Sequence, residues 1–284
     1  VGVFHDDNVN FGPSSKTIET LIGDLEVSSN SRPESAWGLS LCGAVQAYYD
    51  MGEKRYWQGE AGGTVYQNWM DDAGDLELGY YHTFLGLRRL GKTSLLDVPL
   101  KFDHLEYGHS SLMNIAGTDS SFLFAPSLDW NYVTRASLEY RDYYHETTRD
   151  GTYIRVNQAV KRLFGLSRHS VSLSLGAFQE ECNDESFANQ GVEAGLAGEL
   201  RLFSKNTLYA SADLKSMDYE EILLVDLQDE SRTDDQWQFM VGARRAVGRT
   251  WAMDLNYRHI NNDSNFGLYN YERNIIALSS ILAF

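Results

Sequence analysis

Few of the residues that mark common protein classes are present in this chain of 284 residues. It has two cysteines, too few for a disulfide-stapled scaffold, and only four prolines. Basic residues are also scarce: 24 Lys and Arg stand against 40 Asp and Glu, and the formal net charge is −16. A protein that binds nucleic acid presents a basic surface to the phosphates, so this balance argues against a nucleic-acid partner.

Long apolar runs are missing as well. The mean hydropathy is −0.39, and no segment approaches the roughly 18 consecutive apolar residues of a membrane-spanning helix. A membrane span made of β-strands is compatible with this value, because lipid-facing apolar residues and inward polar residues alternate in such strands and cancel in the average.

Apolar residues instead recur at every second position. Between Trp37 and Tyr49 the odd positions are apolar or glycine, whereas the even positions are mostly small or polar. This period is typical of a strand between two different surroundings, and its length exceeds the about five or six residues of an average strand. The alternation predicts strands at 1–8, 36–50, 56–69, 76–88, 93–104, 121–131, 134–144, 152–163, 170–180, 191–203, 207–217, 236–245, 250–260 and 271–284.

The predicted connections alternate in length. Short turns are expected at 51–55, 89–92, 132–133, 164–169, 204–206 and 246–249, and longer connections at 9–35, 105–120, 181–190, 218–235 and 261–270. Short turns on one side and long loops on the other are typical of bacterial outer-membrane barrels. Lys and Arg flank the short turns, whereas the connection 218–235 is mostly acidic.

We therefore predict an all-β fold, a transmembrane antiparallel β-barrel of about 14 strands, with roughly 12 to 16 compatible with the pattern. It forms a single domain over residues 1–284, and a strand at 17–28 is an alternative to the first strand at 1–8. An even strand number places both termini on the short-turn side, which would be the periplasm. Because the chain begins at Val1 without a leader sequence, we expect a removed signal peptide or a periplasmic domain before it.

A soluble β-sandwich or propeller is the alternative fold, but its second buried layer would not tolerate charged residues on the polar side of the strands. In a barrel these residues line the lumen: Glu60, Asp129, Arg141, Arg155, Glu193, Glu199, Arg201, Asp213, Lys215, Asp254 and Arg258. Tryptophans near predicted strand ends are expected to form membrane girdles: Trp57, Trp69, Trp130, Trp237 and Trp251. Phe284 ends an alternating strand and is predicted to be the signal read by the barrel-assembly machinery.

Residue types that carry chemistry do not form a recognisable site in the sequence. Cys42 and Cys182 are predicted to be free thiols, the histidines lack metal-ligand spacing, and no cofactor or metal is expected. The adjacent His109 and Ser110 raise the alternative of an outer-membrane phospholipase or lipid A deacylase. That pair lies in a predicted loop without an evident orienting partner, so we expect no enzyme.

One motif near the N-terminus resembles a known family. Residues 5–13, HDDNVNFGP, are similar to the first barrel strand of surface lipoprotein assembly modifiers and related outer-membrane proteins. In that family an Asp-Asn-Val-Asn strand, followed shortly by proline, opens a barrel of about 14 strands after a periplasmic helical-repeat domain. The resemblance implies a translocation channel that passes protein or polysaccharide to the cell surface.

The residues alone predict a pore wider than an eight-stranded barrel and narrower than a 16-stranded porin. Besides the translocation channel, two alternatives stay open: a passive or substrate-selective porin, and a sheath around a periplasmic partner such as a multihaem electron carrier. Expected partners are outer-membrane lipid and lipopolysaccharide, the barrel-assembly machinery, and a periplasmic partner or exported substrate. Acidic outer loops and a lumen of mixed charge lead to the hypothesis that cations and uncharged or cationic substrates are favoured over anions.

Overall fold

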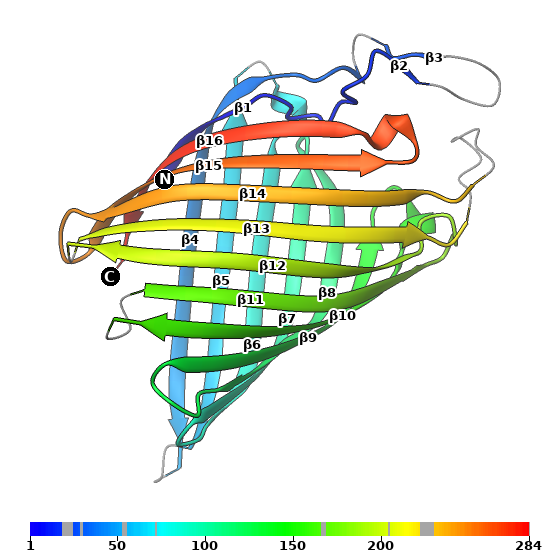
Figure 1. The fold of residues 1–284 in the computed structure, drawn as a ribbon. Coiled ribbons are helices and arrows are strands. Elements are labelled where there is room, and N and C mark those ends of the chain that lie inside the picture. The colour runs from blue at the N-terminus through cyan, green and yellow to red at the C-terminus, as the bar shows by residue number, and fades with distance from the viewer. Residues whose placement is uncertain are drawn as a thin grey trace.

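A computed structural model describes residues 1–18, 25–28, 31–52, 56–71, 73–165, 169–203, 205–221 and 230–283. Fourteen strands close into an antiparallel barrel, which confirms the predicted fold class (Figure 1). The barrel strands are β1 (Gly2–Asp6), β4 (Ala36–Met51), β5 (Trp57–Met70), β6 (Leu78–Leu90), β7 (Ser94–Tyr107), β8 (Ser110–Phe124), β9 (Trp130–Tyr143), β10 (Gly151–Phe164), β11 (His169–Cys182), β12 (Asn189–Leu202), β13 (Asn206–Tyr219), β14 (Thr233–Ala246), β15 (Trp251–Ser264) and β16 (Tyr271–Leu282).

Within the described ranges, three 3-10 helices of three residues each and one small sheet lie outside the barrel. The helices cover Gly74–Leu76, Thr147–Arg149 and Gly267–Tyr269, each in a connection between strands. No helix among the described residues is long and apolar enough to cross a membrane. β2 (Thr17–Ile18) and β3 (Leu25–Glu26) pair only with each other, so the first barrel strand is the one predicted at 1–8 and not the alternative at 17–28.

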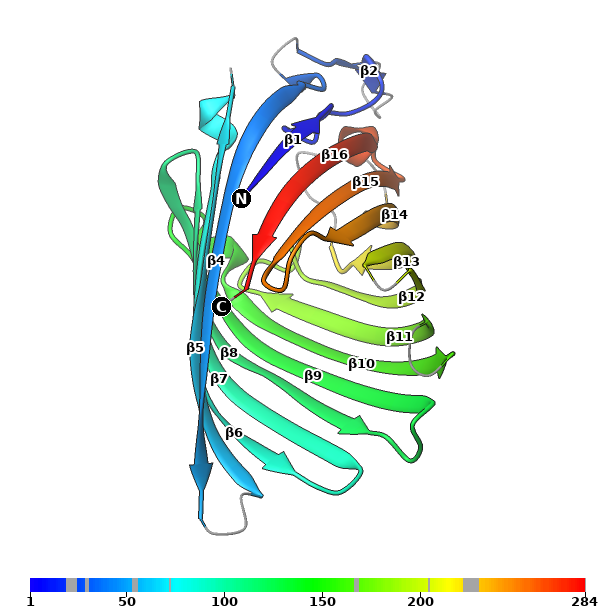
Figure 2. The same cartoon turned by 90° about the vertical axis from the view of Figure 1, so that its left-hand side faces the viewer.

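Each strand pairs with its sequence neighbours, and β1 closes the barrel between β16 and β4 (Figure 2). The period of two predicted from Trp37 to Tyr49 is present throughout β4, whose apolar odd positions are exposed on the outer face. Outward-facing apolar residues of other strands are also exposed. The exposed fractions of Leu85 and Leu100 are 68% and 69%. An apolar outer face of this extent is the reverse of a water-soluble sheet.

The prediction was wrong between residues 105 and 131. The expected long connection 105–120 is mostly strand, because β7 and β8 are joined by the two-residue turn Gly108–His109, whose φ angles are +56° and +64°. Two positive φ angles are typical of a tight hairpin turn. Polar residues stand on both faces of β8, including Asn114 and Ser120 outside, so the alternation was weak there. The true short turn is 125–129, not 132–133.

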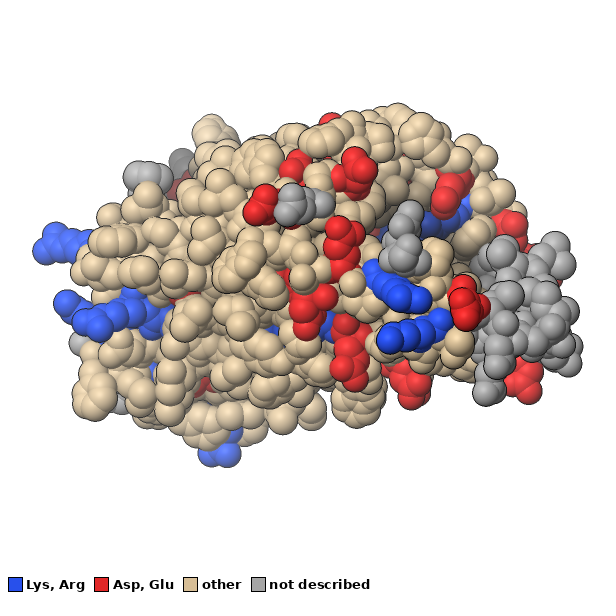
Figure 3. Space-filling model, turned by 90° about the horizontal axis from the view of Figure 1, so that it is seen from above, with Lys and Arg blue, Asp and Glu red and all other residues tan. Residues whose placement is uncertain are grey.

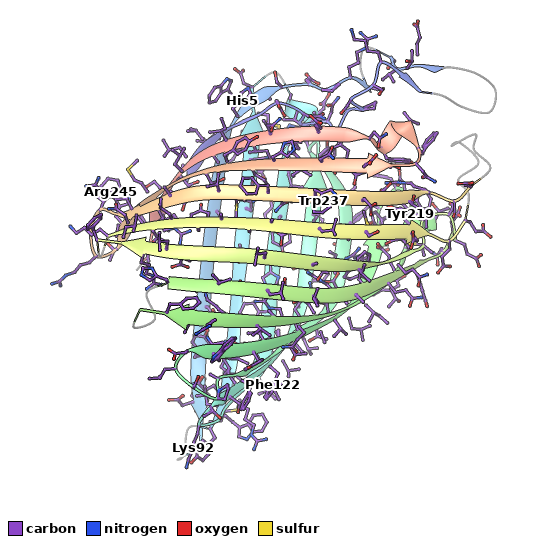
Figure 4. The ribbon with its side chains drawn as sticks, in the orientation of Figure 1. His5, Lys92, Phe122, Tyr219, Trp237 and Arg245 are labelled. Carbon is purple, nitrogen blue, oxygen red and sulfur yellow. The ribbon has the colours of Figure 1, made fainter. Side chains whose placement is uncertain are left out.

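Val1 and Ala283 both lie near the turn between β14 and β15. The Val1 ammonium donates to the Ser280 carbonyl, and the Ala283 amide donates to the Thr250 carbonyl in the turn between β14 and β15. The connections at this end span no more than five residues each, whereas most connections at the opposite end are longer. We call the two ends the short-turn end and the loop end. In Figure 4 the labels of Lys92 and Arg245 mark two tips of the short-turn end.

Candidate functional site

Lys101 on β7 is the centre of a dense charge cluster on the inner face. Its Nζ atom lies 2.6 Å from Glu139 Oε1, 2.7 Å from Asp119 Oδ2 and 3.3 Å from Asp103 Oδ2. The Lys101 side chain is 9% exposed, and Asp103 only 2%. Asp103 also receives hydrogen bonds from β6, through His82 Nδ1 and the Tyr80 hydroxyl. One ammonium therefore links carboxylates of three consecutive strands and neutralises part of their charge.

Ion pairs continue along the wall from this cluster. Arg141 on β9 lies 3.0 Å from Glu139 Oε2 and 2.7 Å from Glu180 Oε1 on β11, and its guanidinium stacks 4.0 Å from the Tyr153 ring centre. Farther toward the short-turn end, Arg155 on β10 lies 2.6 Å from Glu193 Oε1 on β12. The pairs Lys101–Glu139, Arg141–Glu180 and Arg155–Glu193 each reach over one intervening strand and brace the wall from β7 to β12. The bonds to Asp103 join β6 to this wall.

Two smaller charge clusters occupy other parts of the inner face. Arg88 Nη2 lies 2.7 Å from Asp97 Oδ2 and 3.2 Å from Glu60 Oε2, which joins β5, β6 and β7. The other cluster joins β13, β14 and β15. There the Asp254 carboxylate accepts a hydrogen bond from the Tyr209 hydroxyl at 2.7 Å and one from Arg244 Nε at 2.9 Å.

Polar side chains surround several cavities inside the barrel, among them the following three. The largest of these three, of about 890 Å³, lies toward the short-turn end between β10 and β15, and its charged lining residues are Lys161, Glu199, Arg201, Lys205, Arg244 and Asp254. A second, of about 240 Å³, is lined by Arg155, Glu193, Asp213 and Lys215. A third, of about 350 Å³, lies between Asp119, Arg135 and Arg155. The interior thus presents both signs of charge to whatever occupies it.

Ten of the eleven residues predicted for the lumen lie on the inner-facing positions of their strands: Glu60, Arg141, Arg155, Glu193, Glu199, Arg201, Asp213, Lys215, Asp254 and Arg258. Asp129 does not. It is exposed in the turn 125–129, because the strand expected at 121–131 ends at Phe124. The lumen residues predicted from the sequence did not include Lys101, Asp103, Asp119 and Glu139. The alternation of β7 would have placed Lys101 and Asp103 inside.

All six tryptophans have exposed rings on the outer face. Trp57, Trp130 and Trp251 are the first residues of β5, β9 and β15 at the short-turn end. Trp37, Trp69 and Trp237 lie toward the loop end, where Figure 4 labels Trp237 on β14. Phe284, the predicted assembly signal, lies outside the described residues.

The motif at 5–13 forms the closing seam of the barrel. The Asp6 carboxylate, 1% exposed, pairs with both Nε and Nη2 of Arg273 on β16. Asp7 accepts from the backbone amide and the side-chain amide of Asn274. The buried Asn8 accepts from the Gly12 amide at 2.7 Å and donates to the Glu272 carbonyl at 2.8 Å. These side chains clamp β1 to β16 at the loop end.

Apolar contacts fold the first connection over the loop end. Val9 packs with Ala36 and Ala73, while Val27 packs with Phe266 of the β15–β16 connection. The residues after β1 therefore cover part of this end of the barrel, above the seam.

Acidic residues gather toward the loop end. Figure 3 shows Lys and Arg at its left, where the short-turn end lies, and Asp and Glu across its centre and right, with some Lys and Arg among them. Two carboxyl groups of these loops have shifted pKa values. A hydrogen bond and repulsion from Glu185 raise the pKa of Glu221, whereas hydrogen bonds from the Ser186 hydroxyl and amide lower the pKa of Asp184. Residues 222–229 of the predicted acidic connection lie outside the described residues.

The remaining chemical candidates do not assemble into a site. Cys42 and Cys182 are both free thiols, as predicted. Ser110 Oγ donates to the Tyr107 carbonyl, and His109 Nε2 lies 3.5 Å from Glu77, so the adjacent pair is engaged with other groups. Within the described ranges no group of three or more His, Cys, Asp or Glu side chains could hold a metal ion.

Comparison with known proteins identifies the family. The sequence model of the surface lipoprotein assembly modifier family matches residues 1–283. No curated protein matches the chain. A FadL homologue of Pseudomonas aeruginosa has a similar fold, with TM-score 0.55 and 8% identity over 99% of this chain and 89% of that one. Outer-membrane OmpT of Vibrio cholerae is similar at TM-score 0.50 and 9% identity, over 99% and 95% of the two chains. These likenesses show the barrel fold, and the family match confirms the resemblance of residues 5–13: the chain is an outer-membrane β-barrel of the surface lipoprotein assembly modifier family.

Proposed function

We propose that this barrel is a channel that passes the polypeptide of a surface lipoprotein across the outer membrane. The observation that carries the proposal is the family match over residues 1–283, on a closed barrel whose interior is lined by polar and charged side chains. A polypeptide in transit exposes backbone amides and carbonyls, and a wet polar wall of both charge signs satisfies them at little cost. We take a lipoprotein as the transported substrate because the family is one of surface lipoprotein assembly modifiers.

The proposed orientation places the short-turn end and both chain ends in the periplasm and the acidic loops outside. The exposed tryptophans at the two ends would then form girdles at the two lipid headgroup regions, in contact with lipid and lipopolysaccharide. Assembly through a terminal signal at Phe284 remains a prediction.

A matched pair of glycines on β12 tests whether the interior is the path. Gly195 faces inward between Ser174 and Asp213, whereas Gly198 faces outward, and a Cβ atom there would lie at an ordinary contact distance of 3.8 Å from the Ser170 carbonyl oxygen. We expect Gly195→Trp to lower the fraction of lipoprotein reaching the surface of vesicles several-fold, because the indole fills lumen volume. Gly198→Trp should leave that fraction unchanged. Protease accessibility of the lipoprotein outside the vesicles is the readout. Equal transport by the two variants would contradict passage through the lumen.

A porin for small solutes is the second candidate, favoured by the cavity of about 890 Å³ and its charged lining. Steady single-channel conductance of the isolated barrel would support it. In a salt gradient, the acidic loop end predicts a reversal potential that reports cation preference. Anion preference would refute the selectivity hypothesis.

A further inference from the structure

Three described strands carry two adjacent basic residues near the short-turn end. The pairs are Arg88 and Arg89 on β6, Lys161 and Arg162 on β10, and Arg244 and Arg245 on β14. Because successive side chains of a strand point to opposite faces, each pair places one cation in the lumen and one on the outer face. Arg88 and Arg244 form ion pairs with inward carboxylates, and Lys161 lines the cavity of about 890 Å³.

The second residue of each pair faces outward. Arg162 lies opposite Trp130 on β9 and Val171 on β11, and both of these side chains are exposed on the outer face. Arg245 lies opposite the exposed Met253 of β15, and Figure 4 labels it at the end of β14. Residues opposite each other on paired strands share a face. We call the exposed side chains Arg89, Arg162 and Arg245 the outward arginines.

Aromatic rings hold two of the outward arginines at a defined height. The Arg89 guanidinium lies 5.4 Å from the ring centre of Trp57, the residue opposite it on β5. The Arg162 guanidinium lies 5.3 Å from the Trp130 ring centre and 4.9 Å from that of Phe164. Outward tryptophans at strand ends lie at the level of the lipid headgroups, so the two guanidinium groups lie there as well.

The outward arginines have no protein anion to pair with. Within the described ranges no carboxylate forms an ion pair with them, in contrast to the inward Arg88 and Arg244. The outward carboxylates of the described strands, such as Asp142, Glu181 and Asp263, lie near the loop end. A guanidinium at the edge of the hydrocarbon is costly unless an anion neutralises it, and a phosphate accepts two of its hydrogen bonds at once.

We propose that each outward arginine binds the phosphate of an anionic phospholipid in the leaflet that meets the short-turn end. The arginines lie on β6, β10 and β14, four strands apart, so the barrel has three separate sites around its wall. The apolar residues beside them, such as Val171 and Met253, would contact the acyl chains of the same lipid. These sites lie on the outer wall and do not depend on what passes through the lumen.

Two neighbouring residues of β10 provide a matched test, because both substitutions remove one positive charge. Arg162→Gln changes the outer face, and Lys161→Gln changes the lumen. Native mass spectrometry of the full gene product, released from vesicles of phosphatidylglycerol and phosphatidylcholine, gives the ratio of the two lipids that stay bound. We expect Arg162→Gln to lower this ratio by about a third, as one site of three is lost, and Lys161→Gln to leave it unchanged. If the Arg162 variant does not assemble, Arg245→Gln takes its place.

The triple variant Arg89→Gln, Arg162→Gln and Arg245→Gln should lower the ratio several-fold. Equal ratios for Arg162→Gln and Lys161→Gln would overturn the proposal, since the effect would then follow from total charge alone. Vesicles that also contain lipopolysaccharide separate the two sources of lipid phosphate. Loss of bound lipopolysaccharide in the triple variant, with phosphatidylglycerol unchanged, would contradict a phospholipid site. Displacement of phosphatidylglycerol by inorganic phosphate at equal concentration would mean that the arginines bind any phosphate rather than a lipid.

Discussion

The wall from β6 to β12 and the seam from β16 through β1 to β4 are held together by different interactions. In the wall, ladders such as that of β10 and β11 contain 14 residue pairs, and ion pairs reach across the strands inside. In the seam, the side-chain bonds of Asp6, Asp7 and Asn8 gather at the loop end, where β1 lies between β16 and β4.

The two regions therefore depend on different side chains. Buried ion pairs that span strands hold the wall, whereas hydrogen bonds and one ion pair at the loop end hold the seam. The contrast also predicts which substitutions act on the whole barrel and which act on the seam alone.

Loss of the Lys101 ammonium should have the largest effect on the wall. Lys101→Met leaves Asp103 and Glu139, both nearly buried, without their shared cation, and removing one partner of a buried ion pair costs about 3–5 kcal/mol. We expect the free energy of unfolding in urea, measured by tryptophan fluorescence in phospholipid vesicles, to fall by that amount.

A lysine on the same inner face provides the control. Lys161 lines the cavity of about 890 Å³, where water can solvate it, so Lys161→Met should lower the free energy of unfolding by less than about 1 kcal/mol. Similar losses for the two variants would mean that the ion pairs do not brace the wall.

Loss of the Asp6 charge should loosen the seam and leave the wall intact. Asp6→Asn removes the carboxylate that holds Arg273, a charge-assisted interaction with a contribution of about 2 kcal/mol. We expect faster hydrogen exchange of the β1 amides Phe4 and His5, with little change at Val156 in β10. Uniformly faster exchange in both regions would show that seam and wall open together.

The alternation of apolar and polar residues was enough to predict the barrel, its 14 strands and the inner face of most of them. It failed at β8, where Asn114 and Ser120 face outward and remove the contrast between the two faces. The positive φ angles of Gly108 and His109 are a property of the turn that a Gly-His pair signals only weakly. Charge pairing was also beyond the pattern, because Lys101 and Glu139 meet only when the register of three strands is known.

Substitutions in the acidic loops at the loop end should have the smallest effects, because water surrounds the charged groups there. They are the reference for the buried charges inside the barrel. The raised pKa of Glu221 means that its contact with Glu185 is stable while one of the two carboxyls is protonated. That contact is fully present below the ordinary pKa of a glutamate and is lost as the pH rises through the raised pKa of Glu221. The bonds from Ser186 to Asp184 have the opposite sign: they are present above the ordinary pKa of an aspartate and are lost as the pH falls through its lowered pKa.

Side-chain carbon NMR of the barrel in nanodiscs measures both groups. Glu185→Gln should bring the pKa of Glu221 down toward its ordinary value, because a neutral amide no longer repels the second carboxylate. Ser186→Ala should bring the pKa of Asp184 up and leave Glu221 unchanged, which makes it the matched control. Neither substitution should alter the exchange of β1 or β10 amides, since the loop charges lie outside both the seam and the wall. A change in β1 exchange with Glu185→Gln would instead show that the acidic loops are coupled to the closing of the barrel.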